Sequence, residues 1–328
     1  MARMKVFAFD YLREGGPRAP ALPRAFTQQG SMLMDALLAD LAAVPGVDLC
    51  TMAAPAGTLA GASFAERFAG CVQAADAVWP LAPESGGVLE NLSREILRGK
   101  RILLGSAPGA VRVAASKFRV ARALAAGGVP TVPTYRPHAA LPDGEGAWVV
   151  KPDDGAGCLD TRLFSNRAAA LAWIRTSAAQ GYVLQPFVAG KLGSLSLLCC
   201  DGAARLLARN LERVAVHDNR FHFLGSTVNG LIDADGALER LAQQVAAALP
   251  TLWGYVGVDI ILGERGAVVL DVNPRLTAAY AGLHTSIGCN PAGLVIDLLK
   301  GPSAMPAPPG GCRTVSVDVG GFQPGAAT

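Results

Sequence analysis

The chain has 328 residues, which is enough for two or three domains with substantial cores. Hydrophobic residues make up 51% of it and charged residues 17%, a composition typical of globular proteins and not of disordered ones. The formal net charge is only +3 and no lysine- or arginine-rich block occurs, so the charge does not indicate a nucleic-acid partner. No apolar run approaches the length of a membrane span.

The cysteines and the first residues favour a cytoplasmic protein. The seven cysteines are odd in number and form no CxxC pair, which favours reduced thiols over a disulfide framework or a zinc site. The start of the chain, MARMKVFAFD, holds an apolar burst that is too short for a secretory signal. We interpret this burst as the first strand of a fold, over residues 5–10.

Strand-like and helix-like runs alternate over the first 110 residues. The expected strands are KVFAFD, VDLCTM, DAVWPLAP and RILLG, and the expected helices cover 32–44, 63–75 and 87–97. This alternation predicts a parallel sheet with helices on both faces. A dinucleotide-binding fold would place GxGxxG after the first strand, but the chain has YLREGGPR there.

Two lysines follow in places where each could meet phosphate. Ser116 is expected to cap a helix over KFRVARALAAGG, so Lys117 lies in the first turn, where a cation is unfavourable without an anion nearby. Lys151 ends the strand WVVK, before a glycine-bearing loop whose N–H groups could bind phosphate oxygens. Taken alone, Lys117 also fits a solvated surface position, and the loop also fits a purely conformational role. No Walker A sequence occurs.

Neighbouring polar residues leave alternatives open. Asp153 and Asp154 would repel phosphate, so one of them would hold a metal or a substrate ammonium, or would shape the turn. Pro186 in YVLQPFV requires an edge or unpaired position; this segment either hydrogen-bonds an adenine or leads into a loop. The residues 217–222 form an exposed turn or line a substrate pocket.

The residues 193–249 are expected to hold antiparallel strands and one core helix. The strands are predicted from four runs that tight turns separate, GSLSLLCCDG, AARLLARN, RVAVHD and RFHFLG. The helix over 237–249 presents a leucine and valine stripe at helical spacing, which indicates a buried face.

The stretch 254–277 reads as a hairpin with convergent oxygen ligands. Asp259 interrupts the apolar run VGVDIIL, and Asp271 and Asn273 are two apart on the second strand, so they share a face. Pairing of the strands could bring Asp259 beside them. Three such groups between apolar strands are costly unless a cation such as Mg²⁺ lies among them. The alternative is that the aspartates cap or hydrogen-bond locally.

In this order the motifs resemble the ATP-grasp superfamily of ligases over residues 110–300. The resemblance rests on the helix-opening Lys117, Lys151 with its glycine loop, the edge strand, and Asp259 followed by D-x-N-P-R. It implies an α/β (α+β) fold: a parallel α/β domain over 1–110, then two small antiparallel subdomains that clasp ATP, over 111–190 and 191–300. A Pro/Gly linker, a short strand and a flexible tail would occupy 301–328.

The resemblance also implies roles for individual residues. Asp259, Asp271 and Asn273 would bind one or two Mg²⁺ or Mn²⁺ ions, and Arg275 would steady the transferred phosphoryl group or the acyl-phosphate. A glutamate that often binds the ribose after the hinge has no counterpart in VAGKLGS. The ATP contacts would be Lys117, Lys151, Asp154, Gly155, Ala156, Gly157, Gln185, Pro186, Phe187 and Val188.

The implied reaction joins a carboxylate to an amine through an acyl-phosphate, with release of ADP and without a side-chain nucleophile; Cys158 is a less favoured candidate for one. DVNPRLTAAYAGL and KPDDGAG are similar to the tyramine–glutamate ligases of methanofuran biosynthesis, so glutamate and a tyrosine-like amine are the expected substrates. Another amino-acid or dipeptide ligase, or a non-catalytic nucleotide-binding protein, is the alternative.

The partners would be small molecules, without nucleic acid or membrane; a homo-oligomer is left open. Candidates for the amino-acid pocket are Asn219, Arg220, Thr277 and Tyr280.

Overall fold

The computed structural model describes residues 3–16, 24–52, 63–142, 145–155, 157–177, 181–307, 310 and 312–320. Its N-terminal part contains a four-stranded parallel sheet, called sheet A, in the order β2-β1-β3-β4. This confirms the predicted parallel sheet. The strands of sheet A are β1 (Met4–Asp10), β2 (Val47–Cys50), β3 (Ala77–Leu81) and β4 (Ile102–Leu103).

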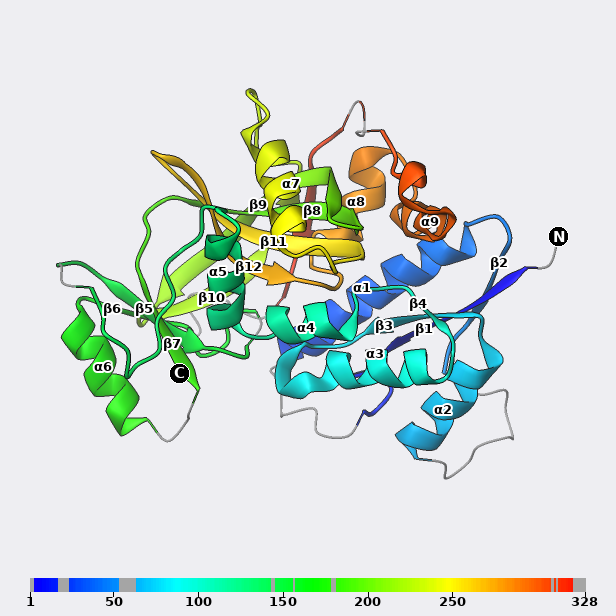
Figure 1. Ribbon diagram of the computed structural model, residues 1–328, viewed down its shortest axis with the longest axis horizontal. Helices are drawn as coiled ribbons and strands as arrows, with labels where there is room; N and C mark the ends of the chain where they lie inside the picture. Colours follow the sequence, from blue (N-terminus) through cyan, green and yellow to red (C-terminus); the bar gives the residue numbers. More distant parts are fainter. Residues whose placement is uncertain are drawn as a thin grey trace.

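Helices cover both faces of sheet A because side chains alternate along β1 (Figure 1). Val6 and Ala8 pack in one core with α1 (Arg24–Ala42), while Phe7 and Phe9 pack in another with α2 (Phe64–Ala74) and α3 (Val88–Arg98). Two predicted boundaries were wrong: α1 begins at residue 24 instead of 32, and β4 has two residues instead of the five of RILLG.

The remaining strands form one nine-stranded antiparallel sheet, called sheet B. Its main path is β12-β11-β8-β9-β10-β6-β5-β7, and β13 pairs with β10. The strands are β5 (Trp148–Pro152), β6 (Arg162–Phe164), β7 (Tyr182–Pro186), β8 (Lys191–Cys200), β9 (Ala203–His217), β10 (Arg220–Val228), β11 (Gly254–Gly263), β12 (Gly266–Asn273) and β13 (Val315–Asp318).

Sheet B corrects one prediction and extends another. AARLLARN and RVAVHD are not two strands joined by a turn but the single long strand β9, which pairs with β8 along one half and with β10 along the other. The C-terminal strand expected near TVSVDV is present as β13 and adds to sheet B. The tail over 321–328 lies outside the described residues.

Sheet B packs one face against helices and carries several polar residues on the other. Leu195, Leu197, Val258 and Ile260 point into a core with helices α5 (Lys117–Ala126) and α7 (Ala237–Ala248). The residues between them, among them Ser194, Ser196 and Asp259, therefore lie on the opposite face. The other helices are α4 (Pro108–Ala114), α6 (Arg167–Thr176), α8 (Tyr280–Ile287) and α9 (Pro291–Asp297), with 3-10 turns η1 (Ser85–Gly87), η2 (Leu298–Lys300) and η3 (Pro302–Ala304).

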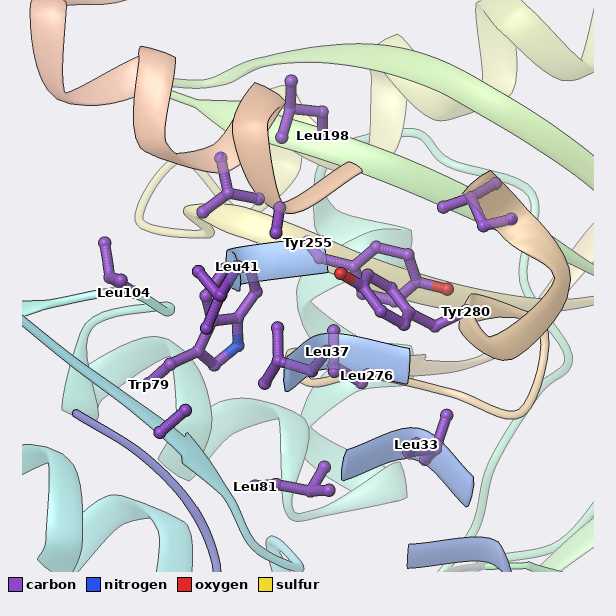
Figure 2. Close-up of a cluster of buried hydrophobic side chains, with 14 of the residues drawn as sticks. Leu33, Leu37, Leu41, Trp79, Leu81, Leu104, Leu198, Tyr255, Leu276 and Tyr280 are labelled. Atoms are coloured by element: carbon purple, nitrogen blue, oxygen red, sulfur yellow. The ribbon is translucent and has the colours of Figure 1, made fainter. Parts of the chain in front are cut away.

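The two sheets share one hydrophobic core. Figure 2 shows Leu37 and Leu41 of α1 and Trp79 of β3 beside Tyr255 of β11 and Tyr280 of α8. This cluster joins the N-terminal part to sheet B, so the two parts are packed together and not only linked by the chain. In the part of the chain that the structure describes, no helix has the length and apolar character needed to cross a bilayer.

Candidate active site

A cavity of about 280 Å³ lies on the polar side of sheet B, between β5 and β7 on one side and β8, β11 and β12 on the other. Apolar side chains, including Val149, Leu192 and Ile261, line most of it. Two lysines and two aspartates also line it. Of the residues predicted from the sequence, those that line this cavity are Lys117, Lys151, Gly155, Gly157, Gln185, Pro186, Phe187, Val188, Asp259, Asp271 and Asn273.

The hairpin of β11 and β12 brings the three predicted metal ligands together. Asp259 pairs directly with Asp271, and the Asn273 amide Nδ2 donates to Asp259 Oδ2 at 3.1 Å. Burial, together with the charge of Asp271, raises the pKa of Asp259 to about 6. Two carboxylates paired across these strands, Asp271 buried and Asp259 partly buried, favour a cation between them. Among the described residues no three His, Cys, Asp or Glu side chains are arranged so that they could hold a metal ion; the trio here consists of two acids and one amide.

Lys117 and Lys151 face these carboxylates but differ in their electrostatics. Lys117 Nζ lies 3.0 Å from Asp271 Oδ2 and donates to the carbonyl of Gly155 at 2.5 Å. Burial lowers the pKa of Lys117, but the charge and hydrogen bond of Asp271 outweigh burial, so the pKa is raised. Burial lowers the pKa of Lys151 to about 8, and Asp271 compensates only in part.

Asp153 shapes the site without lining it. Its carboxylate accepts from the backbone N–H of Phe118 at 2.9 Å, from Ser116 Oγ at 2.8 Å and from Arg136 Nη2 at 3.1 Å. Ser116 is the N-cap of α5, as the sequence predicts. Asp153 therefore fixes the start of α5 against the end of β5, and so holds Lys117 beside Lys151. Of the alternatives for this residue, shaping the local structure fits best.

Two other residues of the glycine loop differ from expectation in their surroundings. Asp154 does not line the cavity; its Oδ2 accepts from the backbone N–H of Gly86 at 2.7 Å. Ala156 lies outside the described residues. Cys158 lines the cavity, but burial raises the pKa of its thiol to about 11. Because the thiolate is the reactive form, this pKa argues against a nucleophilic role.

The strand β7 forms one end of the path of sheet B, as Pro186 requires. Gln185 is buried and its Nε2 donates to Thr134 Oγ1 at 2.8 Å. The chain then turns along the cavity mouth, where the Phe187 side chain is exposed and its N–H donates to the carbonyl of Ala147 at 2.9 Å. The apolar walls here suit a flat aromatic ring, and the charged end suits phosphates.

The remaining predicted residues lie outside the cavity lining. Thr277 Oγ1 is 2.9 Å from the Tyr255 hydroxyl, and Tyr280, which is 1% exposed, donates its hydroxyl to Asp40 Oδ2 at 2.9 Å. Asn219 (φ 58°) forms the turn before β10, where Arg220 is exposed. Thr277 and Tyr280 thus lie in one place and Asn219 and Arg220 in another, and neither pair lines the cavity.

Arg275 lies two residues after the end of β12 and outside the cavity lining, and the sequence does not predict its partner. Its Nε donates to Glu84 Oε2 at 2.6 Å, and Glu84 belongs to the loop after β3. A second unpredicted carboxylate is Glu212 of β9, which accepts hydrogen bonds from Ser194 Oγ and Ser226 Oγ. Burial raises the pKa of Glu212 to about 7. For Glu84 the available signal was an acid directly after a buried parallel strand, where functional groups gather.

Comparison with known proteins matches two stretches of the chain to known domains. An ATP-grasp domain matches residues 114–279, and a pre ATP-grasp 3 domain matches residues 33–111. Tyramine–L-glutamate ligases of Methanocaldococcus fervens and Methanocaldococcus jannaschii are 26% and 27% identical over 205 and 206 residues. These matches cover 62% and 63% of this chain, which spans only 60% and 58% of the length of those relatives.

A solved structure shows the same fold. It is an ATP-grasp superfamily protein from Archaeoglobus fulgidus, with a TM-score of 0.68, 18% identity, and coverage of 89% of this chain and 88% of that one. This likeness extends over both sheets and confirms the expected α/β fold with its parallel and antiparallel parts. Because the ATP-grasp domain alone matches just over half of the 328 residues, the chain belongs to the ATP-grasp family.

Proposed function

We propose that this protein is an ATP-dependent ligase that joins a carboxylate to an amine and releases ADP. The observation that carries the proposal is the arrangement at one end of the cavity, where Lys117 and Lys151 face Asp259 and Asp271. The apolar lining of the cavity suits the flat base of ATP. The two lysines suit its anionic triphosphate, and the two aspartates suit the cation that accompanies it. Phosphoryl transfer depends mainly on such positioning and charge neutralisation.

In this proposal the residues have distinct tasks. Lys117 and Lys151 bind the phosphates together with the glycine loop at 155 and 157, and Arg275 stabilises charge on the transferred phosphoryl group. Asp259, Asp271 and Asn273 would hold Mg²⁺, which would neutralise charge on the phosphates when bound. The substrate carboxylate attacks the γ-phosphorus and ADP leaves. The amine then attacks the carbonyl of the acyl-phosphate, the C–N bond forms, and inorganic phosphate leaves.

For the substrates we propose glutamate and an aromatic amine such as tyramine or tyrosine. The support is the similarity to the two tyramine–L-glutamate ligases. A ligase with another pair of amino-acid substrates remains the second candidate, since the cavity residues bear on ATP and not on the acid. A non-catalytic nucleotide-binding protein is disfavoured because both lysines, the three metal-ligand candidates and Arg275 are all present.

The test is turnover with a panel of acids and amines in the presence of ATP and Mg²⁺. We expect ADP release that depends on both an acid and an amine, with an amide product whose mass identifies the pair. Release of AMP would contradict the acyl-phosphate route. Tight ATP binding without turnover of any pair would favour the non-catalytic alternative, and stimulation by another pair but not by glutamate and tyramine would refute the proposed substrates.

A further inference from the structure

We propose that Glu84, from the N-terminal part of the chain, is a positioning residue that aligns Arg275 for formation of the acyl-phosphate. This inference rests on the proposed function and adds to it a component that comes from outside the ATP-grasp domain. Glu84 lies in the loop over residues 83–87, between β3 and α3, and meets Arg275 across 191 residues of sequence.

The contact between Glu84 and Arg275 is short and buried. Arg275 Nε lies 2.6 Å from Glu84 Oε2, and the two side chains are 17% and 8% exposed. The charge on each partner shortens and strengthens the hydrogen bond, and burial reduces screening by salt. Burial lowers the pKa of Arg275, but the charge and hydrogen bond of Glu84, together with the charges of Asp259 and Asp271, outweigh this effect and the pKa is raised. Arg275 is therefore a fixed cation.

The guanidinium group is held on two of its three nitrogens. Nε is taken by Glu84, and Nη1 donates to the carbonyl of Leu276 at 3.2 Å. Nη2 has no hydrogen-bond partner in the part of the chain that the structure describes. Arg275 is two residues beyond Asn273 and its charge acts on Asp259, so this nitrogen is the one available to an anion beside the proposed metal ligands. A donor fixed before the substrate arrives has little reorganisation left to do during the reaction.

The loop that carries Glu84 is itself fastened to the active site. The backbone N–H of Gly86 donates to Asp154 Oδ2 at 2.7 Å, in the glycine loop that the proposed function assigns to the phosphates. Gly86 and Gly87 have φ values of 65° and 69°, in the region that favours glycine. This local shape lets Glu84 contact Arg275 while Gly86 contacts the glycine loop. It also explains why Asp154 points away from the cavity.

The cost of this arrangement supports a functional reading. Glu84 Oε1 is buried and has no hydrogen-bond partner among the described residues. A buried carboxylate oxygen left in this way costs stability, which calls for an explanation. Glu84 also helps to raise the pKa of Lys117, after Asp271, so its charge reaches the phosphate end of the cavity. Alignment of Arg275 explains why a charged residue is kept there.

The experiment compares Glu84→Gln and Glu84→Ala with Glu90→Gln. Glu90 is a matched control because it binds Arg94 and Arg112 of α3 and α4 at 2.6 and 2.8 Å, outside the cavity lining. Hydroxylamine replaces the amine and traps the acyl-phosphate as a hydroxamate, so this assay reports the first half-reaction alone. The dissociation constant of ATP with Mg²⁺ and the melting temperature are measured beside it.

We expect Glu84→Ala to lower the rate of hydroxamate formation about 100-fold while the KM for ATP changes less than about 2-fold. Glu84→Gln should lose about 10-fold, because the amide oxygen still accepts one hydrogen bond but carries no charge. Glu90→Gln should behave as wild type. In an Arg275→Lys background Glu84→Gln should have little further effect, because Glu84 acts through Arg275.

The alternatives give different results. Wild-type hydroxamate rates in both Glu84 variants would overturn the inference. A loss of amide but not of hydroxamate would also overturn it and would make Glu84 Oε1 a binding group for the amine. Independent, additive losses from Glu84→Gln and Arg275→Lys would refute action through Arg275. If wild-type protein forms no hydroxamate with any acid, the proposed function fails, and this inference with it.

Discussion

Two buried lysines, Lys117 and Lys151, face Asp259 and Asp271 in the cavity, and the pKa values of the two lysines move in different directions. Lys117 has an aspartate at 3.0 Å and its pKa is raised, whereas the pKa of Lys151 is lowered to about 8. A lysine with a lowered pKa gains the most from an anionic ligand, because that ligand restores the missing counter-charge. Lys151 should therefore make ATP binding sensitive to pH.

We predict that the affinity for ATP falls as the pH rises through about 8, because Lys151 then loses its proton. The fall should approach but not exceed tenfold for each pH unit, since one proton is involved. Lys117, with its raised pKa, should stay protonated over the same range. The measurement is the dissociation constant of ATP by titration calorimetry, with Mg²⁺ held constant.

Lys151→Arg is the matched variant for this test. Arginine stays protonated, so the variant should bind ATP with an affinity that does not change through pH 8. An equally steep decline in Lys151→Arg, or a flat profile for wild type, would show that Lys151 is not the titrating group at the phosphates.

The convergence of Asp259, Asp271 and Asn273 on one hairpin could be predicted from the sequence, because these residues are near in sequence and strand pairing fixes their positions. A D-x-N pattern puts two ligands on one face, and a short turn puts Asp259 opposite Asp271. Glu84 could not be paired with Arg275 in this way, because 191 residues separate them and only the packing of the two sheets brings them together. The same holds for the hydroxyl of Tyr280 on Asp40.

At the scale of elements, the start of α5 is the best example of local structure that serves the site. Ser116 caps the helix and Asp153, from the end of β5, accepts from the N–H of Phe118. A lysine in the first turn is unfavourable for the helix dipole. Asp153 and Asp271 offset this effect and keep Lys117 in the cavity.

We predict that Asp153→Ala lowers the free energy of unfolding by about 2 kcal/mol, because a hydrogen bond to the first turn of α5 and a partly buried ion pair with Arg136 are lost. It should also weaken ATP binding, because α5 and Lys117 lose their anchor. Urea unfolding and calorimetry measure the two effects.

Asp233→Ala is the control, since Asp233 accepts from the N–H groups of Leu238 and Glu239 at the start of α7, outside the cavity lining. Asp233→Ala should lower the free energy of unfolding by a similar amount and leave the affinity for ATP unchanged. Equal ATP affinities in the two variants would refute the link between Asp153 and Lys117.

The extent of the long strand β9 in sheet B is harder to predict from the sequence. The long strand β9 was divided in two, because its polar stretch Arg209–Asn210 resembles a turn in the sequence. In the structure Asn210 is fully buried and its Nδ2 donates to Ser194 and Ser196 on the neighbouring strand. Polar residues inside a strand are tolerated where cross-strand partners exist, and those partners are visible only once the strands are paired.

At the scale of the whole molecule, the N-terminal part and sheet B are joined by a common core and by a polar contact within it. Asp40 of α1 accepts from the Tyr280 hydroxyl at 2.9 Å and lies 2.5 Å from Nδ1 of His284, both on α8. Glu84 and Arg275 form a second contact between the same parts. We propose domain borders near residues 110, 190 and 300; the border at 190 falls within sheet B, whose pairing continues from β10 to β6.

We predict that Tyr280→Phe lowers the free energy of unfolding by about 1–3 kcal/mol, because Asp40 Oδ2 loses its buried donor. The KM values for both substrates should stay within about twofold of wild type, since the Tyr280 side chain does not line the cavity. An increase in the KM for the amine with unchanged stability would contradict this and would return Tyr280 to the substrate pocket.

We propose that a carboxylate is activated as an acyl-phosphate at the end of this cavity. The most direct test is transfer of ¹⁸O from a carboxylate-labelled acid substrate, followed by mass analysis of the released phosphate. We predict one ¹⁸O atom in each phosphate, because the carboxylate oxygen that attacks phosphorus leaves with it, and ADP as the nucleotide product. Phosphate without ¹⁸O, or label found in AMP, would contradict the claim.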